Sequence, residues 1–251
     1  MNSLMNVTII TGASRGLGLA LAQQLLARGA QVLTLQRQPD DSLTAPSGQL
    51  EQWACDLTGP EPAAARLAAW VQALPRRSLA SLTLINNAAG MTRVAPLSDI
   101  RLADLASALR VGLEAPTLLT AAFLGASADV MAPRKVLHIS SGLGRRAMAG
   151  AAIYCAAKAG LDHLARALAL EQAARPHGAR VVSLAPGVID TDMQVQLRDA
   201  DPSEFPDRET FVQLKALGRL DSPQAAAAKV LAYLDRADFG ANPVADVRDP
   251  T

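Results

Sequence analysis

Short runs of β-branched and aliphatic residues alternate along the chain with longer segments rich in alanine and leucine. The short runs are continuously apolar, which is typical of parallel strands covered by helices on both faces. Residues 190–220, with Pro202 and Pro206 among many charges, are predicted to be irregular. We predict strands at 7–10, 32–36, 50–54, 82–86, 136–140, 180–184 and 244–247, and helices at 16–28, 62–74, 101–110, 115–130, 152–174 and 223–235.

This alternation predicts an α/β fold, with one doubly wound parallel sheet of about seven strands and helices on both faces. No internal repeat or low-complexity linker divides the chain, so residues 1–251 are expected to form a single domain. Such sheets bind ligands beyond the carboxyl ends of their strands, where the strand order reverses. Residues that carry chemistry are therefore expected directly after strands.

A glycine-rich turn, T-G-A-S-R-G-L-G, occupies Thr11–Gly18 directly after the first predicted strand. Glycines allow a tight turn and close approach of a pyrophosphate to the backbone, and the helix that follows offers unpaired N–H groups to an anion. The spacing G-x-x-x-G-x-G differs from the general dinucleotide fingerprint G-x-G-x-x-G. Three glycines can also simply form a tight corner, but this position in the alternation favours nucleotide binding.

The end of the second strand carries Gln36 and Arg37, and the nearest acids, Asp40 and Asp41, lie beyond a proline. An arginine can hold a 2′-phosphate through charge-assisted, forked hydrogen bonds. Arg15, inside the glycine turn, can reach the same phosphate. Either arginine alone would fit a solvated surface charge; together, with no acid at the strand end, they favour NADPH as the cofactor.

Tyr154 and Lys158 stand four residues apart near the start of a predicted helix, so their side chains share one face. At ~4 Å and an effective dielectric constant of ~20, the pair energy is about 4 kcal/mol, which lowers a tyrosine pKa by at most ~3. We therefore expect a Tyr154 pKa nearer neutrality, suited to general acid or base work. A surface pair would have the same spacing. Ser141, at the end of the preceding strand, adds a hydroxyl that can bind a substrate carbonyl.

With these motifs in this order, nearly the whole chain resembles the short-chain dehydrogenase/reductase family. Thr11–Gly18 resembles the family's TGxxxGxG turn, 86–90 its NNAG segment and 186–191 its PGxxxT segment. Ser141, Tyr154 and Lys158 match its catalytic serine, tyrosine and lysine in order and spacing. The resemblance implies a Rossmann-type fold that binds NADP(H) through Gly12, Ser14, Arg15, Gly16, Leu17, Gly18, Arg37, Asp56, Leu57, Asn87, Ala88, Tyr154, Lys158, Pro186, Gly187, Val188 and Thr191.

The resemblance also implies hydride transfer between the nicotinamide and a carbonyl or alcohol carbon. Tyr154 would protonate the developing alkoxide, Lys158 would lower the tyrosine pKa and bind the nicotinamide ribose, and Ser141 would polarise the carbonyl. The implied activity is NADPH-dependent reduction of a ketone or diketone to an alcohol.

One position departs from the family pattern, because Gly112 stands where the family usually has an asparagine that supports a water linked to the lysine. A glycine inside a helix costs about 1 kcal/mol relative to alanine and can leave a kink or a water-filled gap. An alternative function follows: a catalytically impaired, NADP(H)-sensing protein of the same fold. The joint presence of Ser141, Tyr154 and Lys158 favours the enzyme.

Residues 188–220 resemble the family's variable substrate lid, and in particular that of the benzil reductase and sepiapterin reductase-like subgroup. That resemblance implies a diketone or another bulky apolar carbonyl as the substrate. Phe205 and Phe211 are candidates for the pocket wall, although both can equally be packing residues. Arg145 and Arg146 fit solvated surface charges better than a site for an acidic substrate.

Composition excludes several other classes. The 251 residues carry 24 basic and 23 acidic side chains and only 3% aromatics, a balance that argues against a nucleic-acid partner. The scattered histidines and the spacing of Cys55 and Cys155 predict no metal site, and both thiols are expected to be buried.

The chain shows neither a signal-peptide pattern nor an apolar run long enough for a membrane span. The cytoplasm and no membrane partner are the resulting predictions. The helix predicted at 152–174 carries more apolar surface than one buried stripe needs, which predicts a homodimer or homotetramer.

Overall fold

A computed structural model describes residues 4–46 and 48–249 of the chain. Its strands are β1 (Met5–Thr11), β2 (Gln31–Gln36), β3 (Leu50–Ala54), β4 (Leu79–Asn86), β5 (Arg134–Ile139), β6 (Arg180–Ala185) and β7 (Val244–Asp246). Its α-helices are α1 (Gly16–Ala27), α2 (Glu61–Ala73), α3 (Leu102–Leu109), α4 (Ala115–Ala126), α5 (Ala152–Ala173), α6 (Asp192–Arg198), α7 (Arg208–Ala216) and α8 (Pro223–Leu234).

The seven strands form one parallel sheet in the order β3-β2-β1-β4-β5-β6-β7. The chain winds outward from β1 to β3 in one direction and from β4 to β7 in the other. The strand order therefore reverses between β1 and β4, where a doubly wound sheet binds its ligand. The predicted fold class is confirmed.

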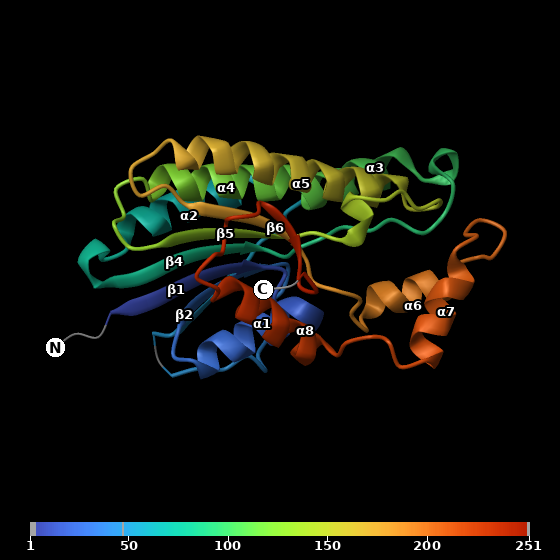
Figure 1. Ribbon diagram of the computed structural model, residues 1–251, viewed down its shortest axis with the longest axis horizontal. Coiled ribbons are helices and arrows are strands. Elements are labelled where there is room, and N and C mark those ends of the chain that lie inside the picture. The colour runs from blue at the N-terminus through green and yellow to red at the C-terminus, as the bar shows by residue number, and fades with distance from the viewer. Residues whose placement is uncertain (1–3, 47, 250–251) are drawn as a thin grey trace.

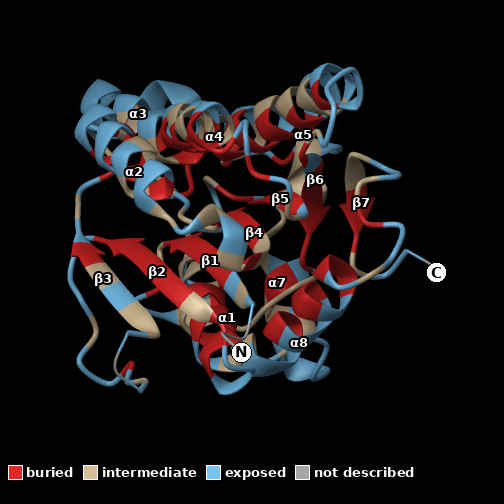
Figure 2. Cartoon of the chain, turned by 90° about the vertical axis from the view of Figure 1, so that its left-hand side faces the viewer, coloured by how far each residue is buried: buried red, intermediate tan, exposed pale blue. Residues whose placement is uncertain are grey.

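Helices cover both faces of this sheet (Figure 1). Successive residues of a strand point to opposite faces, so Ile10 packs with α1 and α8 while Ile9 packs with α2, α4 and α5. Figure 2 shows the result: buried strands between two helical layers whose outer surfaces are exposed. None of the helices in the described part of the chain is both long and apolar enough to cross a membrane.

The segment 190–220 is more regular than predicted, because it contains α6 and α7, which are set off from the sheet in Figure 1. Both helices are short, and the two prolines that suggested irregular structure lie between them. Phe205 and Phe211 are buried here, with ring centroids 5.6 Å apart.

Helices α3 and α4 are joined by one turn of π-helix, Arg110–Glu114, which is called the π-turn below and has Gly112 at its centre. A π-turn is a known cause of helix irregularity, so the kink expected at this glycine takes this form. A Cβ atom on Gly112 would lie 3.1 Å from the Cβ of Ala157 on α5. Ala157 therefore fills the space beside the glycine, where a water-filled gap was the other expectation.

Candidate active site

The glycine turn between β1 and α1 forms a cradle of backbone in which Gly12 and Gly18 leave no room for a side chain of their own. Gly12 and Gly16 have positive φ angles of 69° and 55°. A Cβ on Gly12 would lie 2.9 Å from the Cα of Ala88, and one on Gly18 would lie 2.2 Å from the carbonyl oxygen of Gly12. The turn therefore requires glycine at these positions, and it presents bare backbone at a helix N-terminus, an arrangement suited to a pyrophosphate.

Asn87 and Thr11 hold this turn against the end of β4. The Asn87 Nδ2 donates to the carbonyl oxygens of Thr11 and Gly12, both at 3.0 Å. The Thr11 Oγ1 accepts from the backbone N–H groups of Asn87 and Ala88 at 3.0 and 2.9 Å. The side chains of Asn87 and Thr11 thus hold the turn in shape. The sequence pattern did not indicate this structural role for Thr11.

The ends of β2 and β3 carry the residues predicted for the adenosine end of the cofactor. Arg37 and Asp56 are both exposed there. Hydrogen bonds from Thr58 lower the pKa of Asp56, and the charge of Arg37 acts in the same direction. Asp40 instead accepts from the backbone N–H and hydroxyl of Ser42 at 2.9 and 2.7 Å, within its own loop. This geometry leaves Arg37 as the charged residue at the end of β2.

The segment after β6 lies opposite the glycine turn. The Cγ2 of Thr191 lies 3.5 Å from where a Cβ on Gly16 would be, and Arg15 forms a 2.8 Å ion pair with Asp192, the first residue of α6. Gly187 has a positive φ angle of 84°. The structure thus brings residues 12–18 and 186–191 together.

Of the other predicted cofactor residues, Ser14 is exposed, Pro186 is buried and Val188 is half-buried, while the Leu17 and Leu57 side chains pack in the core.

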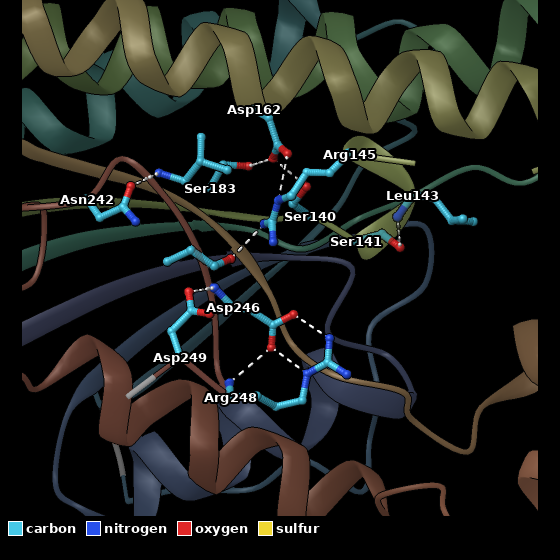
Figure 3. A network of polar contacts seen from close by, with 12 residues as sticks. Ser140, Ser141, Leu143, Arg145, Asp162, Ser183, Asn242, Asp246, Arg248 and Asp249 are labelled. Atoms are coloured by element: carbon cyan, nitrogen blue, oxygen red, sulfur yellow. Dashed lines mark hydrogen bonds and ion pairs between the residues drawn. The ribbon is translucent and has the colours of Figure 1, made fainter. Parts of the chain in front are cut away.

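Ser141, Tyr154 and Lys158 meet where β5 ends against α5. The Lys158 Nζ donates to the carbonyl oxygen of Ile139 at 2.7 Å and lies 5.5 Å from the centre of the Tyr154 ring. The Ser141 Oγ accepts from the N–H of Leu143 at 3.2 Å, which orients the turn after β5 (Figure 3).

The expected lowering of the Tyr154 pKa is wrong for this structure. Burial raises it to about 12, an effect that Ser141 partly opposes. Burial also lowers the pKa of Lys158 to about 8. Loss of water around the phenol is the largest cause of the raised pKa. The Lys158 ammonium is directed at the carbonyl oxygen of Ile139. At neutral pH, Tyr154 is therefore a protonated phenol, the form that donates a proton.

A buried polar group under α4 and α5 was missed from the sequence. His138 on β5 is fully buried, and its Nδ1 lies 3.2 Å from the Nδ2 of Asn86, which also donates to the Thr120 Oγ1 at 3.0 Å. Burial, with the Lys158 charge, lowers the pKa of His138 to about 4. The histidine is thus neutral at physiological pH.

This buried histidine predicts acid sensitivity. Its folded-state pKa of about 4 lies below the ordinary value of 6.5, so the unfolded chain binds the proton more tightly. The associated stability is present above pH 6.5 and is lost as the pH falls towards 4. Between pH 7 and 5, His138 alone should lower the free energy of unfolding by about 2 kcal/mol.

Urea unfolding of wild type and His138→Asn at both pH values measures this loss. The variant should lose correspondingly less stability on acidification. The same loss in both proteins would show that other groups cause the acid sensitivity.

The two cysteines are free and half-buried, more exposed than predicted. Among the residues that the structure describes, no three His, Cys, Asp or Glu side chains are grouped so that they could hold a metal ion.

Comparison with known proteins matches residues 6–202 to the family model described as short chain dehydrogenase. Benzil reductase ((S)-benzoin forming) of Bacillus subtilis is 33% identical over 92% of this chain and 94% of its own. Sepiapterin reductase of Mus musculus is 35% identical over 97% of each chain. A putative NAD(P)-dependent gluconate 5-dehydrogenase from Beutenbergia cavernae, solved with NADP at low occupancy, is 27% identical, with a TM-score of 0.80 over 98% of this chain and 96% of that one.

Proposed function

Since the chain belongs to the short-chain dehydrogenase family of oxidoreductases, we propose that it reduces a ketone or diketone to an alcohol with NADPH. The observation that carries the proposal is that Ser141, Tyr154 and Lys158 meet at the carboxyl end of β5. The glycine turn lies at the carboxyl end of β1, on the same side of the parallel sheet. Tyr154 is protonated at neutral pH, which is the form that donates a proton during reduction.

In this mechanism a bound nicotinamide supplies the hydride that the carbonyl carbon accepts. Ser141 donates a hydrogen bond to the carbonyl oxygen, and Tyr154 donates its proton to the same oxygen as negative charge develops there. The Lys158 ammonium stabilises the phenolate that Tyr154 leaves. An ammonium has three N–H donors, so a bond to Ile139 leaves others for the nicotinamide ribose.

The surroundings of Tyr154 support a bulky apolar substrate. Its ring belongs to an apolar cluster that also contains Phe205 and Phe211 of the proposed lid, 188–220. Phe205 and Phe211 are themselves buried, at 0% and 7% exposure, so they are packing residues that support the lid and do not line an open pocket. The apolar surroundings that they give the proton donor suit a diketone with hydrophobic substituents. The names of the benzil reductase and sepiapterin reductase relatives are consistent with this substrate class. The other buried members of the cluster are Val94, Met148, Ala151 and Leu197.

NADPH is the proposed cofactor because Arg37 stands at the end of β2, while Asp40 is bound within its own loop. Arg37→Ala should remove a charge-assisted bond to the 2′-phosphate, worth about 1.5–3 kcal/mol. The Kd for NADPH should rise about tenfold or more, and the Kd for NADH should change little.

This preference is tested by titrating the protein with NADPH and with NADH and monitoring the nicotinamide fluorescence. Arg77→Ala is the matched control, since Arg77 is also exposed but lies before the amino end of β4, at the opposite end of the strands from Arg37. Tighter binding of NADH than of NADPH, unaffected by Arg37→Ala, would contradict the proposed cofactor.

NADPH oxidation assayed against diketones, quinones, pterins and 3-oxoacyl thioesters tests the activity itself. The proposal expects turnover with at least one apolar diketone. Tight NADPH binding without turnover of any carbonyl would favour the sensing function suggested by Gly112. The cytoplasm and a homodimer or homotetramer remain predictions.

A further inference from the structure

Three residues on one face of α5 lie against Ile139, the last residue of β5, and the two serines that follow it. Tyr154, Lys158 and Asp162 follow one another at intervals of four, so they form one stripe along the helix. The stripe faces 139–141: Lys158 binds the carbonyl oxygen of Ile139, Asp162 binds Ser140, and Tyr154 interacts with Ser141. The first two residues of the stripe belong to the proposed mechanism, which does not use Asp162.

Asp162 is a buried carboxylate whose oxygens are all engaged. Its Oδ1 accepts from the hydroxyls of Ser140 and Ser183 at 2.6 and 2.7 Å. Its Oδ2 accepts from the Nε of Arg145 at 3.4 Å, and the Nη2 of the same arginine donates to the carbonyl oxygen of Ala245 at 2.7 Å (Figure 3). The side chain of Asp162 is only 2% exposed. One carboxylate therefore joins α5 to β5, to β6 and to the turn that follows Ser141.

Burial of a carboxylate costs folding free energy unless a nearby cation or hydrogen-bond donors compensate its charge, since an isolated ion is poorly solvated inside a protein. Arg145 compensates it only partly, because the contact is long and the arginine side chain is 34% exposed. Lys158, one helical turn away and 2% exposed, is the other cation beside it. Burial lowers the pKa of Lys158, and the Asp162 charge is what opposes this effect.

Asp162 is the anion that acts on Lys158. His138 of β5 is neutral, and Asp246 of β7 is bound by Arg248. The ionisable groups on the elements packed against α5 are Asp104 of α3, Arg110 and Glu114 of the π-turn, Arg145 of the turn after β5, Arg180 of β6 and Asp246 of β7. Those on α5 itself are Tyr154, Cys155, Asp162, His163, Arg166 and Glu171, and His138 of β5 also acts on Lys158.

We propose that Asp162 is a positioning residue of the active site, which holds the end of β5 against α5 and keeps the Lys158 ammonium charged beside Tyr154. The catalytic consequence rests on the proposed function. The electrostatic effect on Lys158 does not, so it can be measured in the absence of turnover.

Asp162→Asn is the test variant, because an amide oxygen can still accept from the two serines while the charge is lost. Removal of a nearby opposite charge should lower the pKa of Lys158 by about 1 or more. The chain contains four lysines, so NMR titration with isotope-labelled lysine can follow each ammonium, with Lys158→Arg to assign the signal. In reduction assays, the loss of rate at high pH should move to lower pH by the same amount.

Two controls separate charge from packing. Glu171→Gln makes the same chemical change at an exposed position of α5 and should leave the Lys158 pKa unchanged. Ser183→Ala removes one hydrogen bond without a change of charge, so it should lower thermal stability and leave that pKa unchanged. An unchanged Lys158 pKa in folded Asp162→Asn would overturn the proposal.

Arg145→Gln provides a second variant if Asp162→Asn does not fold. It removes the cation that faces Asp162 at a partly exposed position, so the carboxylate acts on Lys158 unopposed and the lysine pKa should rise. An unchanged or lower pKa would also overturn the proposal. Failure of the wild type to reduce any carbonyl would count against the proposed function and leave these titrations interpretable.

Discussion

Tyr154→Phe is expected to lower the kcat for carbonyl reduction by about 10²- to 10⁴-fold, the usual contribution of a positioned general acid. The substitution keeps the ring in the apolar cluster with Phe205 and Phe211 and removes only the hydroxyl. The Kd for NADPH should change little, because the glycine turn and Arg37 are untouched. Steady-state rates with a diketone, together with cofactor titration, measure both quantities.

The second tyrosine of the chain provides the matched control. Tyr233 lies on α8, on the other face of the sheet, and is as buried as Tyr154, with 9% exposure. Tyr233→Phe should leave kcat unchanged. Equal rates for Tyr154→Phe and wild type would remove Tyr154 from the role of proton donor.

Gly18→Ala is expected to damage both the fold and cofactor binding. The new methyl group would lie 2.2 Å from the carbonyl oxygen of Gly12 and 2.5 Å from the Nδ2 of Asn87, so the turn must move. Overpacking of this kind costs about 1–3 kcal/mol of stability. The shifted turn would no longer hold the pyrophosphate in the same geometry, so the Kd for NADPH should rise about tenfold or more, equivalent to ~1.4 kcal/mol of binding free energy.

Gly125→Ala separates this effect from helix propensity, since Gly125 lies in α4 with no atom within 4 Å of a Cβ at that position. There the alanine should stabilise the protein by about 0.5–1 kcal/mol and leave NADPH binding unchanged. Urea unfolding and cofactor titration of both variants make the comparison. Wild-type NADPH affinity in Gly18→Ala would contradict the assignment of the cradle.

The sheet could be predicted because its strands are buried on both faces and its helices are long and rich in alanine and leucine. Ile9 and Ile10 illustrate this, since each contacts a different helical layer and both must be apolar. The region 190–220 could not be predicted in the same way. Its helices are short, and their buried residues, such as Phe205, contact a distant part of the chain that sequence pattern does not identify.

The positions of the site residues could be predicted from motif order, but their ionisation could not. The Tyr154–Lys158 spacing predicted the shared face, whereas burial of the phenol and the bond from Lys158 to Ile139 depend on tertiary packing. The signal for Asp162 was present, since it stands four residues after Lys158. Its partners Ser140 and Ser183 come from two strands, and only the fold brings them to the same carboxylate.

Hydride transfer from the cofactor to the carbonyl carbon can be followed by isotope labelling. Wild-type protein is incubated with benzil or another responsive diketone and NADPH deuterated at both hydrogens of nicotinamide C4. The expected result is an alcohol product with deuterium on the former carbonyl carbon, detected by mass spectrometry and formed much more slowly by Tyr154→Phe. Product without deuterium, or tight NADPH binding with no product from any carbonyl tested, would contradict it.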